Sequence, residues 1–103
     1  MITTHVLDVA RGRPAAGVPV TLDRLDGDWV RVGEGVTDAD GRCKTLISGP
    51  AAPGTWRLTF DTGAYDPDGF FPEAVIVFRV RDARHHHVPL LLSPFGYSTY
   101  RGS

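Results

Sequence analysis

The sequence predicts an all-β domain, built as a sandwich or a barrel. About eight short segments rich in strand-forming residues alternate with turn signals roughly every dozen residues, which is typical of such folds. Twelve glycines and eight prolines punctuate these segments, and no segment has a sustained helical period. A chain of 103 residues is near the commonest domain size, so we expect one domain over residues 1–103 with a thin core.

The first half of the chain contains four predicted strands. Residues 4–9 form the first, and a loop rich in Gly and Pro follows it at 11–17. In residues 18–23, three apolar side chains alternate with polar residues and a proline, which predicts a strand with one buried face. Asp-Gly pairs mark the turns that precede two further predicted strands, at 29–33 and 42–46.

The next segments follow a long loop over residues 48–54. Residues 55–60 alternate again, with apolar side chains on one face. Residues 64–69 have room for a single helical turn at most. The longest predicted strand covers 74–81 and also alternates between two faces.

Residues 87–103 contain strand-forming segments, so we do not expect them to fray as the ends of a chain usually do. The run at 88–92 is apolar without alternation, so both of its faces should be covered, one by the core and the other by a second subunit. A Ser-Pro-Phe-Gly turn then leads to a strand-forming segment at 97–100. The end of the chain, with an arginine, a hydroxyl and a carboxylate, would thereby be held in a structure, and it is a place to look for a site.

Composition excludes several classes of partner. Eleven Lys plus Arg against twelve Asp plus Glu give a net charge of -1 without a basic block, so we expect no nucleic acid. The chain start lacks a signal-peptide pattern, and no apolar run approaches the roughly 20 residues that a membrane span needs. The single cysteine, Cys43, is interpreted as a small apolar core residue and fits a reducing compartment. We therefore expect a soluble, cytoplasmic protein.

The histidines are the first candidates for chemistry. On a strand, His85 and His87 share one face while His86 points to the other. A pair spaced in this way can hold a metal, but no third ligand stands at a recognised spacing, so we predict no metal. We interpret His85 and His86 as a solvated entrance to the strand. His5 and His87 each lead into an apolar strand, where a neutral imidazole can act as a general base, although their position alone favours a structural role.

Five separated motifs resemble the transthyretin-like proteins, and among them the 5-hydroxyisourate hydrolase branch. They are Thr-His-Val-Leu-Asp at 4–8, Asp-Gly-Arg at 40–42, Phe-Phe-Pro-Glu at 70–73, the segment 85–94, and Tyr-Arg-Gly-Ser at 100–103. The resemblance covers the whole chain, and the tail is its most specific part, since the hormone carrier transthyretin lacks it. Two features depart from the family pattern: His86 stands where Tyr is usual, and the stretch 64–69 is shortened.

The resemblance implies a transthyretin-like β-sandwich of two antiparallel sheets. It also implies a homotetramer, a dimer of dimers, with active sites in the channel between the dimers. The implied reaction is the hydrolytic opening of the six-membered ring of 5-hydroxyisourate, a step of urate degradation within purine metabolism. The scheme requires no cofactor and no metal, and its partner is the small-molecule substrate.

The resemblance also implies roles for individual residues. His5 and His87 would position and deprotonate water, and which of them is the base is left open. Arg42, which would otherwise be an ordinary surface charge, would bind the planar substrate through its guanidinium and stabilise developing charge. The predicted catalytic residues are His5, Arg42, His87 and Ser103, and the predicted substrate-binding residues are His5, Arg42, Tyr100, Arg101 and Gly102.

Two other functions fit a sandwich of this kind. A carrier would bind a small aromatic ligand in the same channel, and it has no need for paired histidines, an arginine and a fixed chain end together. An adhesion or scaffold domain would concentrate its distinctive residues in exposed loops. Catalytic turnover separates both from the hydrolase.

Overall fold

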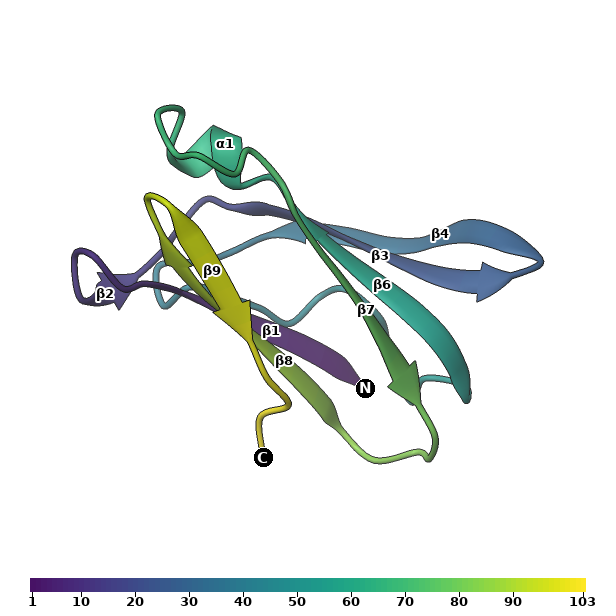
Figure 1. Cartoon of the computed structure of the whole chain (residues 1–103). Helices are drawn as coiled ribbons and strands as arrows, with labels where there is room; N and C mark the ends of the chain where they lie inside the picture. The colour runs from purple at the N-terminus through teal and green to yellow at the C-terminus, as the bar shows by residue number, and fades with distance from the viewer.

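Two β-sheets face each other in the computed structural model, which describes residues 1–103 (Figure 1). The elements are β1 (Ile2–Asp8), β2 (Arg13–Pro14), β3 (Pro19–Asp26), β4 (Asp28–Val36), β5 (Arg42–Cys43), β6 (Gly54–Phe60), α1 (Thr62–Tyr65), β7 (Ala74–Val80), β8 (His86–Ser93) and β9 (Gly96–Thr99). The predicted all-β sandwich is confirmed. The structure contains no helix that is both long enough and apolar enough to cross a bilayer.

The sheets have five and four strands. The first has the order β2-β1-β8-β9, with β5 also paired to β1, and the second has the order β4-β3-β6-β7. All neighbouring strands are antiparallel except β1 and β8, which run parallel. A parallel pair needs a long connection, and β1 and β8 have almost the whole chain between them. This pairing brings the first strand of the chain beside the strand that carries the histidine cluster.

Some elements differ from the prediction. β2 lies in the predicted loop at 11–17, and the helical turn begins at Thr62, before the predicted stretch. β5 ends at Cys43, whereas the sequence predicted a strand to residue 46. After Cys43 the chain leaves the sheet and passes so close to Gly33 of β4 that any Cβ there would collide with the Leu46 carbonyl. Leu46 is thereby buried in the core without being part of a strand.

The core lies between the two sheets. The alternating apolar residues of β6 face inward, as predicted, and Cys43 is buried among them. On β8, the inward side chains Val88, Leu90 and Leu92 are buried, while Leu91 on the outer face is only partly covered. The prediction that the core covers one face of residues 88–92 is thus confirmed. That a second subunit covers the other face stays a prediction.

A buried carboxylate ties three strands of the second sheet together. The pairing of β3 with β4 shifts register between Leu22 and Asp23, and the side chain of Asp23 is 3% exposed. Its oxygens accept hydrogen bonds from Arg31 Nε at 2.7 Å and from Arg57 Nη2 at 2.9 Å. Burial acts to raise the pKa of Asp23, but the hydrogen bonds and charges of Arg31 and Arg57 outweigh it and lower the pKa.

We expect Asp23→Asn to lower the free energy of unfolding by about 1–3 kcal/mol at neutral pH, because the neutral amide keeps one acceptor oxygen, and its NH2 group faces the other guanidinium. The folded-state pKa of Asp23 is depressed, so this stability is present above the unfolded pKa of 3.8 and is lost as the pH falls through the folded pKa. Urea unfolding should therefore show a gap between wild type and variant at pH 7 that narrows at about pH 3. Asp26→Asn, at the exposed end of the same strand, is the matched control. A gap independent of pH would contradict the assignment.

Candidate active site

Three of the predicted catalytic residues lie on the outer face of the five-stranded sheet. Alternation along β1 buries Ile2, Thr4 and Val6 in the core and turns His5 outward. In the antiparallel pairing of β1 with β5, His5 stands opposite Arg42. In the parallel pairing of β1 with β8, Thr3 stands beside His87. Because paired residues project from the same face of a sheet, His5, Arg42 and His87 form one surface.

A tight turn places Arg42 beside His5. One carboxylate oxygen of Asp38 accepts hydrogen bonds from the backbone N–H groups of Asp40 at 2.9 Å and Arg42 at 3.0 Å. The Arg42 N–H bond is the largest cause that lowers the pKa of Asp38. Gly41 has φ of 74°, and a Cβ on it would stand 2.5 Å from the Val6 carbonyl oxygen. Glycine at position 41 thus allows the turn to contact β1 closely, so that β5 begins beside it at Arg42.

His87 is held as a neutral imidazole in partly buried surroundings. Its Nδ1 lies 2.8 Å from the Thr3 hydroxyl, whose oxygen is also 2.6 Å from Nε2 of His85. Burial is the main cause that lowers the pKa of His87, and electrostatic interactions with Arg42, His85 and His5 lower it further. The prediction that His85 and His87 share a face is confirmed, with their ring centroids 6.2 Å apart.

The prediction of a solvated strand entrance is wrong for His86. Its residue is 4% exposed, and its Nδ1 donates a hydrogen bond to the carbonyl of Arg84 at 2.7 Å. The backbone N–H of His86 bonds to the Met1 carbonyl, so β8 already lies beside the chain start at this residue. The side chain of His86 points inward and is therefore covered, whereas His85 is exposed, as predicted.

The chain end closes over His87. The Gly102 N–H donates to the His87 carbonyl at 2.8 Å, and a Cβ on Gly102 would stand only 2.6 Å from Cδ2 of the imidazole. Glycine is thus required for this contact. Ser103 lines the same cleft as His87. The cleft has a volume of about 480 Å³ and is lined by Met1, Thr3, Thr4, Arg42, Lys44, His85, His87 and Ser103.

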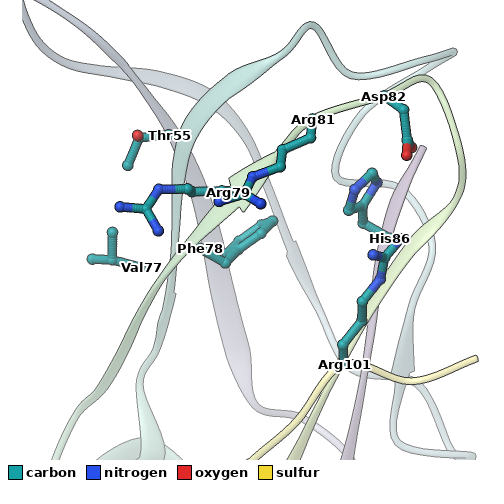
Figure 2. Close-up of a pocket in the computed structure, with 8 residues that line it drawn as sticks. All are labelled: Thr55, Val77, Phe78, Arg79, Arg81, Asp82, His86 and Arg101. Atoms are coloured by element: carbon teal, nitrogen blue, oxygen red, sulfur yellow. The ribbon is translucent and has the colours of Figure 1, made fainter.

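Tyr100 and Arg101 lie elsewhere in the single chain. Arg101 lines a cleft of about 500 Å³ between β7 and the tail, where Figure 2 shows its side chain directed toward His86. Arg79 and Arg81 line the same cleft. Tyr100 lines an adjoining, more apolar cleft of about 310 Å³. The two side chains do not join His87 within one chain, and their predicted substrate-binding role stays a prediction.

Two residues around His87 were missing from the sequence-based site. Thr3 contacts both His85 and His87, and Lys44 follows Arg42 into the cleft. The alternation of β1 was the available signal for Thr3, because residues two apart on a strand share a face and His5 was already a candidate. No group of three or more His, Cys, Asp or Glu side chains is arranged to hold a metal ion.

The arrangement suits attack by water on a carbonyl group. A neutral imidazole accepts a proton from water, and a guanidinium stabilises the negative charge that develops on the carbonyl oxygen. The lowered pKa of His87 keeps its ring available as a base at neutral pH. His5 stands opposite Arg42, within the same outer face.

Known proteins with similar sequences cover the whole chain. A profile described as the HIUase/Transthyretin family matches residues 2–102. The chain is 50% identical to the uric acid degradation bifunctional protein TTL of Arabidopsis thaliana, with 99% of this chain and 37% of that protein covered. It is 46% identical to the 5-hydroxyisourate hydrolase of Salmonella dublin, with 100% of this chain and 81% of that protein covered. The chain thus spans little more than a third of the plant relative but most of the bacterial one.

Solved structures with the same fold include a 5-hydroxyisourate hydrolase and a transthyretin bound to thyroxine. The 5-hydroxyisourate hydrolase of Klebsiella pneumoniae superposes with a TM-score of 0.87 at 40% identity, covering 99% of this chain and 98% of that one. Sea bream transthyretin in complex with thyroxine superposes with a TM-score of 0.88 at 35% identity, covering 98% and 93%. The transthyretin-like form of the sandwich is therefore confirmed. Since the two TM-scores are nearly equal, the fold alone does not separate an enzyme from a carrier.

Proposed function

Because the chain belongs to the HIUase/transthyretin family, we propose that it hydrolyses 5-hydroxyisourate to 2-oxo-4-hydroxy-4-carboxy-5-ureidoimidazoline, a step of urate degradation. The observation that carries this proposal is the cleft in which His87, Arg42 and Ser103 meet. A carrier gains nothing from a half-buried neutral imidazole beside a guanidinium, whereas a hydrolase uses both.

In the proposed reaction, water adds to a ring carbonyl of the substrate. As the water oxygen bonds to the carbonyl carbon, one proton passes to an imidazole, and the Arg42 guanidinium stabilises the oxyanion. The ring C–N bond then breaks, and the proton goes to the departing nitrogen. The product is a carboxylate with a free ureido group. His87 and His5 share the positioning and deprotonation of water, and the tail residues Gly102 and Ser103 complete the cleft.

The proposed enzyme is a homotetramer, a dimer of dimers, and acts in the cytoplasm. Support for assembly comes from β7 and β9, which are edge strands of the two sheets and whose residues jointly line one cleft. Val75 and Val77 on β7 and Tyr97 on β9 are exposed apolar side chains, and an open edge readily pairs with another chain. For the location, a single unpaired Cys43 fits a reducing compartment.

The proposal predicts turnover with a defined product. The purified protein should accelerate the loss of freshly generated 5-hydroxyisourate above its spontaneous decay, measured by ultraviolet absorbance. Circular dichroism should show a product of one hand, because water held by the protein reaches one face of the ring. The matched control is the same reaction with heat-denatured protein. A racemic product at the background rate would rule out the enzyme.

A further inference from the structure

The Thr3 hydroxyl links two histidines in one hydrogen-bonded chain. Its oxygen is 2.6 Å from Nε2 of His85 and 2.8 Å from Nδ1 of His87. Thr3 is buried near the start of β1, where it pairs with His87 of β8, so this hydroxyl has few other partners. We propose that Thr3 and His85 are positioning residues. They hold the His87 ring so that the lone pair on its Nε2 is directed at the substrate cleft. This proposal rests on the proposed hydrolase function.

A hydroxyl group has a single proton, so Thr3 can donate to only one of the two ring nitrogens. In the proposed arrangement its O–H group donates to Nε2 of His85, 2.6 Å away. Once its only proton is used, the Thr3 oxygen accepts from Nδ1–H of His87 at 2.8 Å. A neutral imidazole has one N–H, so Nε2 of His87 is left as the base.

The remaining charges around His87 come from several elements. The guanidinium of Arg42 on β5 and the imidazole of His5 on β1 face it, as does His85 before β8. Lys44, Met1 and Ser103 line the same cleft. None of these groups is placed as the acceptor of Nδ1–H. Thr3 thus supplies an interaction with the ring that these surrounding charges do not provide.

In this arrangement His85 accepts the Thr3 proton and leaves the hydroxyl oxygen to accept from Nδ1–H of His87. We expect His85→Ala to lower kcat by only a few-fold, because the Thr3 oxygen still accepts from His87.

Thr3→Val tests the proposal most directly. It keeps the shape of the side chain and removes the acceptor, so kcat should fall about 10- to 100-fold with KM nearly unchanged. The acid limb of the pH profile of kcat should move to lower pH, because Nδ1–H of the imidazolium loses its acceptor. Thr3→Ser retains the hydroxyl and should stay within about threefold of wild type. Wild-type kcat with an unmoved acid limb in Thr3→Val would overturn the proposal.

Two further measurements separate this role from folding and from the function itself. Thr99→Val removes a hydroxyl that donates to the Pro89 carbonyl at 2.7 Å on the neighbouring strand, and it should keep wild-type kcat. Should Thr3→Val fail to fold, ¹⁵N NMR of the wild-type imidazoles decides: a proton on Nδ1 of His87 supports the proposal, and a proton on Nε2 overturns it. An inactive wild-type protein would instead refute the hydrolase.

Discussion

His87→Asn is expected to lower kcat by about 10²- to 10⁴-fold, the loss typical for removal of a general acid or base. The amide has a similar polar reach but cannot take a proton from water near neutral pH. The fold should remain, because His87 is on the outer face of β8 while the core residues Val88 and Leu90 are unchanged. Single-turnover kinetics with 5-hydroxyisourate, alongside far-ultraviolet circular dichroism, measures both effects.

The wild-type pH profile provides an independent check of the base. Burial and the nearby Arg42 charge lower the pKa of His87 from its ordinary 6.5, so the ring stays neutral at pH 7. As the pH falls through that lowered pKa, the ring becomes protonated and kcat should decline before the protein unfolds. A kcat that stays flat down to the unfolding pH, or a His87→Asn variant with near wild-type kcat, would assign the base to another group.

The periodic parts of the fold were predictable from the sequence. Alternation in residues 18–23 and 55–60 identified the strands and their buried faces, because a two-residue period leaves little choice of face. The extent of β5 was not predictable, because its end depends on Leu46 crossing Gly33, a contact between distant segments. The burial of Asp23 depends likewise on a register shift and on two arginines from other strands.

The sequence predicted which residues belong to the site better than it predicted how they are arranged. His5, Arg42 and His87 were identified through the resemblance to the 5-hydroxyisourate hydrolase branch, because their positions alone fit structural histidines and a surface arginine equally. Their proximity depends on the register of β1 with β5 and β8, which a single sequence does not encode locally. The role of Thr3 depends on the same register, because alternation along β1 indicates only that Thr3 shares a face with His5.

Gly102→Ala is expected to lower kcat by about 10²-fold, because small misplacements of a catalytic group can have effects of this size. A methyl group at this position would stand 2.6 Å from Cδ2 of the His87 ring and 3.3 Å from its Cβ and Cγ. Either the imidazole shifts or the tail moves off it, and the second outcome also withdraws Ser103 from the cleft. The free energy of unfolding should change little, since Gly102 lies outside the core. Steady-state kinetics and urea unfolding of the variant measure the two quantities.

Gly96→Ala is the matched control for this substitution. Gly96 also lies in the last part of the chain, but a Cβ there would meet only the Ser93 hydroxyl at an ordinary 3.8 Å. Its backbone does not have the positive φ that favours glycine. The same change of one methyl group should thus leave kcat unaltered at position 96 and reduce it at position 102. Equal kcat values for the two variants would show that the tail packs on His87 without influencing the reaction. Gly102 and Ser103 would then not belong to the proposed active site.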